Sequence, residues 1–97
     1  MGVRFNREYE DILKDFTEAL ASIEDSAAFV EMEVSEWKQL KPIIRKEIAQ
    51  TIADDLFFAL GEDAIIDFGQ TKAVYDPTSH EIALIKAKGE KITIKLI

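Results

Sequence analysis

The residues whose side chains could do catalytic chemistry are few in this 97-residue chain. Its single histidine, His80, lies between Ser79 and Glu81, so one short segment holds the three residue types of a hydrolytic triad. Neighbouring residues of a strand point to opposite faces of a sheet, and these three side chains would therefore not meet. Because the chain has no cysteine, it has neither a thiol nucleophile nor a thiolate metal ligand. We expect a surface histidine and no enzyme.

Carboxylates that lie close together in the sequence could bind a hard cation such as Mg²⁺ or Ca²⁺. They are Asp54, Asp55, Glu62, Asp63 and Asp67. Their spacing is not that of an EF-hand loop, and the isolated glycines form no phosphate-binding loop. The tripeptide Asp67-Phe68-Gly69 matches a kinase motif in letters only, because the chain is too short for a kinase domain. We expect no metal, no cofactor and no small-molecule substrate.

Acidic residues dominate the first third of the chain. Between Glu8 and Glu36 ten residues are acidic and one, Lys14, is basic. Four of the acids would form one stripe along a helix: Glu8, Asp11, Asp15 and Glu18. This stripe suits docking on a basic protein or mimicry of nucleic-acid phosphates. It is also what any amphipathic helix shows on the side away from its apolar residues, and we favour that simpler interpretation.

Basic residues gather in two places. Lys38, Lys41 and Arg45, with Lys46 beside them, would share a helical face if one helix ran through them. The C-terminal segment adds Lys86, Lys88, Lys91 and Lys95. Such patches can neutralise phosphates, but the chain has 19 acidic and 12 basic residues and interleaves no aromatic residues for base stacking. Weak nucleic-acid binding through the 38–46 cluster is therefore only a second alternative.

Two apolar groups are candidates for partner binding. Trp37 lies beside the basic cluster, and a tryptophan in so small a domain is more often core than contact, although exposed aromatic residues are enriched at interfaces. The other group is Ile82, Leu84 and Ile97, which would share one face of a hairpin and need a cover. The cover would be the first helix or another subunit.

The first part of the chain changes its periodicity. Apolar residues at steps of three and four predict an amphipathic helix over 6–24, capped by Asn6. The apolar residues that follow alternate with glutamates, which predicts a short strand over 28–34. Ser35 then has the chemistry of an N-cap for a short helix.

The longest predicted helix covers 42–60. Pro42 suits the first position of a helix, so we expect either a kink near Lys41 or a new helix at Pro42. Isoleucines and leucines at four-residue spacing continue the pattern, and Gly61 is a natural stop. The last turns are apolar over most of their circumference.

The remainder of the chain is predicted to form strands. The segments are 64–68, 72–75, 80–87 and 91–97. Asp76 and Pro77 predict a turn, and Gly89 suits a two-residue turn in the C-terminal hairpin. That turn would place Ala83 opposite Leu96, whereas a three-residue loop would reverse the faces.

Together these elements predict an α+β fold in a single domain over 1–97. Two main helices would pack on a mainly antiparallel sheet of three or four strands, which ends in a C-terminal β-hairpin. No motif identifies a family.

We expect a small acidic, non-catalytic protein-interaction module of bacterial or phage accessory type. Its partner would be another protein or a second copy of itself, most simply in a homodimer. The alternative is an acidic inhibitor or nucleic-acid-mimic decoy that binds a nucleic-acid-handling protein. No apolar run approaches the ~18 residues of a membrane span, so we expect no membrane association and a cytoplasmic protein.

Overall fold

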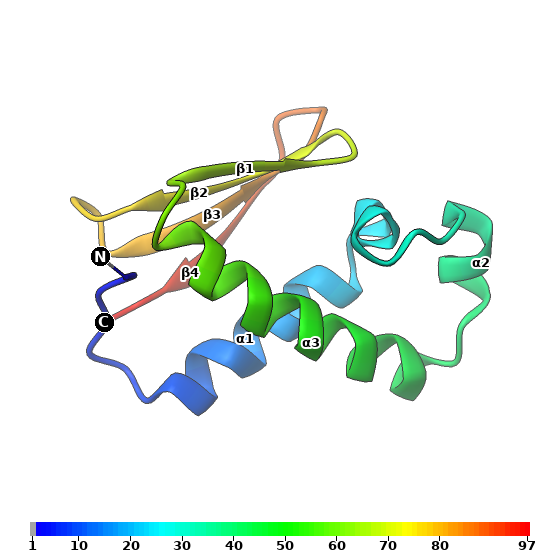
Figure 1. Cartoon of the computed structure of the whole chain (residues 1–97), viewed down its shortest axis with the longest axis horizontal. Coiled ribbons are helices and arrows are strands. Elements are labelled where there is room, and N and C mark those ends of the chain that lie inside the picture. Colours follow the sequence, from blue (N-terminus) through cyan, green and yellow to red (C-terminus); the bar gives the residue numbers. More distant parts are fainter. Residues whose placement is uncertain (1) are drawn as a thin grey trace.

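Four helices precede four strands in the structure, a computed structural model that describes residues 2–97 (Figure 1). The helices are α1 (Tyr9–Ala21), the 3-10 helix η1 (Glu24–Val30), α2 (Val34–Gln39) and α3 (Pro42–Leu60). The strands are β1 (Ile65–Phe68), β2 (Thr71–Asp76), β3 (Glu81–Ile85) and β4 (Lys91–Lys95). The strands form one antiparallel sheet in the order β1-β2-β3-β4. The predicted α+β fold with a C-terminal hairpin is confirmed.

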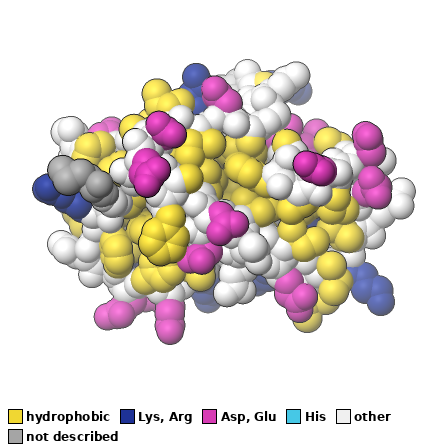
Figure 2. Space-filling model, viewed as in Figure 1, with side chains coloured by type: hydrophobic (Ala, Val, Ile, Leu, Met, Phe, Trp, Pro, Cys, Tyr) yellow, Lys and Arg dark blue, Asp and Glu magenta, His cyan; other side chains and the backbone are white. Residues whose placement is uncertain are grey.

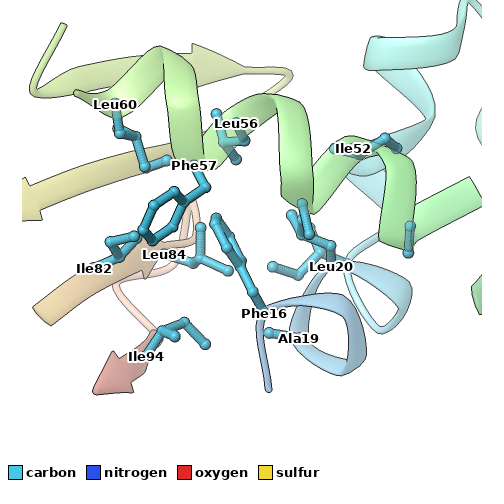
Figure 3. Close-up of a cluster of buried hydrophobic side chains, with 14 of the residues drawn as sticks. Phe16, Ala19, Leu20, Ile52, Leu56, Phe57, Leu60, Ile82, Leu84 and Ile94 are labelled. Carbon is cyan, nitrogen blue, oxygen red and sulfur yellow. The ribbon is translucent and has the colours of Figure 1, made fainter. Parts of the chain in front are cut away.

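The helices and the sheet form two layers. α1 packs on α3 and on β4, while η1 contacts β1 (Figure 1). α2 lies at the end of the molecule that is remote from the sheet. The core lies between the layers and includes Phe16 and Leu20 of α1, Leu56 and Phe57 of α3, and Ile82, Leu84 and Ile94 of the sheet (Figure 3).

The first helix is shorter than the predicted 6–24. It begins after Glu8 and ends at Ala21. Asn6 is not its cap, because Glu8 occupies the N-cap position. The backbone N–H of Asn6 instead donates to the carbonyl of Leu96 at 2.8 Å. The backbone N–H of Arg7 donates to the same carbonyl at 3.1 Å. The residues before α1 are therefore held beside the end of β4 rather than wound into the helix.

The strand predicted over 28–34 is wrong. The chain instead winds into η1 directly after α1, and buried Ser26 fixes this turn by donating from Oγ to the carbonyl of Leu20 at 2.7 Å. Val30 and Val34, which would have formed the inner face of a strand, are exposed. Ser35 lies inside α2, whose N-cap is Glu33. Three alternating apolar residues without a neighbouring strand to cover them are too weak a signal to make a strand.

The long helix begins where proline allows it. Lys41 is the N-cap of α3 and Pro42 its first residue, so the predicted new start at Pro42 is confirmed. The helix ends at Leu60, but Gly61 is not in the left-handed conformation expected of a glycine stop, since its φ is −70°. A side chain at Gly61 would instead come within 2.8 Å of the Cα of Gly2. Within residues 2–97, no helix is long and apolar enough to cross a membrane.

The C-terminal hairpin has a three-residue loop. The N–H of Lys86 donates to the carbonyl of Glu90, and the N–H of Gly89, at φ +89°, donates to the carbonyl of Lys86. The predicted pairing of Ala83 with Leu96 is therefore wrong. The observed register pairs Ile82 with Ile94, Ala83 with Thr93 and Leu84 with Ile92. Ile82 and Leu84 point into the core, so the helices cover their face of the sheet (Figure 3).

Candidate interaction surface

The residues that resemble a catalytic triad form a turn instead. The carboxylate of Asp76 accepts hydrogen bonds from the hydroxyl of Ser79 at 2.9 Å and from the backbone N–H of Thr78 at 3.0 Å. The hydrogen bond from the Ser79 hydroxyl, helped by the backbone bonds, lowers the pKa of Asp76. His80 is exposed and has a positive φ of 54°. Ser79 is thus engaged by Asp76 as part of the turn between β2 and β3.

The predicted carboxylate clusters do not assemble into a metal site. Among residues 2–97, no three histidine, aspartate or glutamate side chains are grouped so that they could hold a metal ion. Asp54 accepts a hydrogen bond from the hydroxyl of Tyr9, which joins α3 to α1. Burial, followed by the hydrogen bond to Asp54 and the negative charge of that carboxylate, raises the pKa of Tyr9. This pair connects the two helices.

The predicted basic cluster is divided by the break between α2 and α3. The guanidinium of Arg45 donates to the carbonyls of Leu40 at 2.8 Å and Lys38 at 3.3 Å, so it satisfies the C-terminal end of α2. Lys38 pairs with Glu24 of η1 at 2.9 Å. Lys41 is exposed at the N-cap of α3. These residues do not share one helical face, and two of them hold the local structure together.

The acidic stripe Glu8, Asp11, Asp15 and Glu18 is exposed along α1. Asp15 pairs with Arg7 at 3.0 Å, and Glu18 lies 3.8 Å from the ammonium of Lys46 on α3. Such exposed ion pairs contribute between about 0 and 1 kcal/mol. The stripe is partly neutralised by residues of the chain itself.

The apolar candidates divide between core and surface. Trp37 is 2% exposed, so the interpretation as a core residue is confirmed. Ile82 and Leu84 are buried, so the cover that was expected for these two residues is supplied within the chain. Ile97 is exposed. The structure does not bring these residues together into one surface patch.

Part of α3 is exposed and apolar, and the signal for it in the sequence was the apolar circumference of the last turns of the predicted helix. Residues at alternating steps of four and three lie on its outward side, and they are Ile44, Ile48, Thr51, Asp55 and Phe58. Phe58 is 69% exposed and Ile44 is 40% exposed. We call these five residues the outward stripe. The last turns of α3 are apolar over most of their circumference, and Phe58 in these turns is exposed although such helical surface is normally covered.

An apolar groove lies beside the outward stripe, between η1, α3 and β1. Its volume is about 380 Å³, and it is lined by Phe29, Val30, Ile48, Thr51, Ile52, Asp55, Leu56, Ala59 and Ile66. The ring of Phe29, which is 37% exposed, packs on the ring of buried Phe68 with 4.7 Å between ring centres. Phe29 is thus held by the sheet and forms a wall of the groove.

The charge that lines this groove is negative. Asp55 is the charged residue among those that line it. A shallower hollow on the other side of Thr51 is lined by Leu13, Glu47, Gln50, Thr51 and Asp54. Figure 2 shows apolar and acidic side chains next to one another on this face, with basic side chains towards the margins of the view. Within residues 2–97, no lysine or arginine lines either hollow.

Two further hollows differ in chemistry. One, of about 450 Å³ between α1 and α3, is lined by residues that include Glu10, Lys14, Lys46 and Glu47. The other, of about 500 Å³ near the hairpin loop, includes Glu24, Asp25, Lys86, Lys88 and Glu90. Both mix the two signs of charge, whereas the groove between η1, α3 and β1 is mainly apolar. The groove between η1, α3 and β1 is therefore the best candidate for a contact surface.

Comparison with known proteins identifies no relative: no family model, no curated protein and no solved structure matches the chain.

Proposed function

We propose that this chain is a non-catalytic protein-interaction module that binds its partner through the outward stripe of α3 and the adjoining apolar groove. One observation carries the proposal: α3 leaves Ile44 and Phe58 exposed, and the same helix lines an apolar groove walled by Phe29 and Val30. Exposed apolar surface bordered by polar residues is typical of protein-binding sites. Aromatic residues such as Phe29 and Phe58 are enriched in the centres of these surfaces.

The alternative functions have less support from the arrangement of residues. A decoy would use the stripe of α1, but Arg7 and Lys46 already lie beside two of its four carboxylates. A nucleic-acid-binding protein would use the 38–46 cluster, in which the guanidinium of Arg45 is engaged by the end of α2. Each alternative therefore depends on charged groups that the fold already uses.

Site-specific photo-crosslinking in cells of the source organism tests the proposal. A photoreactive phenylalanine analogue in place of Phe58 should give one recurrent protein adduct, because this position is exposed at the proposed contact. The same analogue in place of Asp11, which is equally solvent-facing but lies on α1, is the matched control. Adducts that are absent at position 58, or that are the same at both positions, would contradict the proposal.

A further inference from the structure

We infer that the occupant of this surface is a basic amphipathic helix, whose apolar residues enter the groove and whose lysines or arginines meet the carboxylates of α3. This inference rests on the proposed function and names the chemistry of the partner. Amphipathic helices commonly bind by laying their apolar face into such a groove.

The first argument is charge. Asp55 faces the groove, while Glu47 and Asp54 line the neighbouring hollow on the other side of Thr51. Glu47 also borders the hollow that contains Lys14 and Lys46. Within residues 2–97, none of these three has an ion-pair partner, although Asp54 accepts the hydrogen bond from Tyr9. A partner that covered this surface without positive charge would desolvate the carboxylates and leave them uncompensated, which is costly. A basic partner removes that cost.

The second argument is shape. The outward stripe runs from Ile44 to Phe58, which at the rise of an α-helix corresponds to about 21 Å. A partner helix of about four turns has the same length and presents apolar residues with the same three- and four-residue periodicity. The α3 residues that line the groove run from Ile48 to Ala59, so the groove follows α3 for about three turns.

The charge argument also disfavours a second copy of this chain. If two α3 helices packed antiparallel about Thr51, Asp55 of each copy would lie near Glu47 of the other. If they packed parallel, each carboxylate would meet its own equivalent. Both arrangements place like charges together at the centre of the contact, which disfavours the complex.

The test uses the full chain and two synthetic peptides. One peptide, of about 14 residues, carries leucines at helical spacing and lysines elsewhere, and the other has glutamate in place of every lysine. We expect the lysine peptide to bind and to shift the backbone amide signals of η1, α3 and β1 in NMR spectra. The glutamate peptide should not bind.

A charge-reversal pair separates specific docking from general attraction to an acidic protein. Asp55→Lys should weaken binding of the lysine peptide by about tenfold or more, because the charge faces the groove. Asp11→Lys makes the same change in net charge on α1 and should leave the affinity within about threefold. Ala59→Leu, which narrows the groove from an exposed helical position, should weaken binding without unfolding the protein.

Several outcomes would overturn this inference. Equal losses in Asp55→Lys and Asp11→Lys, equal binding of the glutamate peptide, or signal shifts confined to α1 would each do so. A stable dimer that Phe58→Arg dissociates would identify a second copy as the occupant instead. If the lysine peptide fails to bind but Phe58 still crosslinks to one protein, the inference is wrong and the proposed function stands. If both experiments fail, both are wrong.

Discussion

The two long helices of this protein use their outer sides in opposite ways. α1 buries Ile12, Phe16 and Leu20 on one side and carries carboxylates on the other, so its outer side is suited to water. α3 buries an equally apolar side and still presents Ile44 and Phe58 to solvent. The contrast teaches that an acidic outer side of an amphipathic helix is stable in water without a partner, whereas exposed apolar residues are the ones that favour a cover.

The largest expected effect is a difference in folding stability between substitutions of a buried and of an exposed phenylalanine. Phe16→Ala should lower the free energy of unfolding by about 3–5 kcal/mol, because it removes a fully buried ring and leaves a cavity between α1, α3 and the sheet. Phe58→Ala should change it by less than about 0.5 kcal/mol, because Phe58 lies on the surface. Denaturant unfolding followed by circular dichroism measures the free energy of unfolding of each variant. A comparable loss of stability in the two variants would contradict the distinction between a buried residue of α1 and an exposed residue of α3.

A smaller effect is expected at Asp25, which anchors the η1 wall of the groove to the sheet. Its carboxylate accepts hydrogen bonds from the hydroxyl of Thr71 at 2.7 Å and from the backbone N–H of Gln70 at 3.1 Å. Asp25→Ala leaves the buried Thr71 hydroxyl without its acceptor and should cost about 1–3 kcal/mol.

The adjacent Glu24 is the control for Asp25. It pairs with Lys38 at the surface, so Glu24→Gln should change the free energy of unfolding by less than about 1 kcal/mol. Equal effects of the two substitutions in a urea titration would show that Asp25 is not an anchor. Weaker binding of the lysine peptide to Asp25→Ala at temperatures where it is folded would sharpen the comparison between the two helix surfaces.

The stripe on α1 should tolerate loss of charge. Asp11→Asn removes an exposed carboxylate and should change the free energy of unfolding by less than about 0.5 kcal/mol, with no effect on partner crosslinking at Phe58. Thermal unfolding by calorimetry gives the first quantity. If crosslinking at Phe58 disappeared in Asp11→Asn, the result would contradict the proposal that α3 contacts the partner while the outer side of α1 faces solvent.

The smallest effect concerns pH. Because the pKa of Asp76 is lowered, its ionised carboxylate favours the folded turn above the ordinary aspartate pKa, and this contribution is lost as the pH falls through the lowered value. An NMR titration of the Asp76 carboxyl should therefore have its midpoint below that of an ordinary aspartate. Ser79→Ala should move the midpoint upward, and an unchanged midpoint would contradict the role of the Ser79 hydroxyl.

Local chemistry made part of the fold predictable. Pro42 and the polar residues before it marked the start of α3 correctly, because proline at a first helical position needs no information from the rest of the chain. The hairpin register did not follow from local chemistry, since Gly89 suits loops of two and three residues alike. The choice between them depends on which face the helices cover, and that face is defined only when Ile82 and Leu84 meet the helices.

The candidate surface was hidden for a related reason. An apolar residue at position 44 or 58 of the sequence looks the same whether the fold covers it or not. Arg45 looked like part of a basic patch until the break at Leu40 exposed carbonyl groups that its guanidinium could satisfy. In both cases the role of a residue depends on the groups that the fold places beside it, and periodicity carries no information about them.

The hydrogen bonds from the backbone of Asn6 and Arg7 to Leu96 have a consequence for folding kinetics. They join segments that are separated by nearly the whole chain, so they close a very long loop. The entropy cost of closure rises only slowly with loop length, but it must be met before the contact contributes any stability. We therefore expect this closure among the late steps of folding. We also expect the segment before α1 and the end of β4 to open and close together in hydrogen exchange.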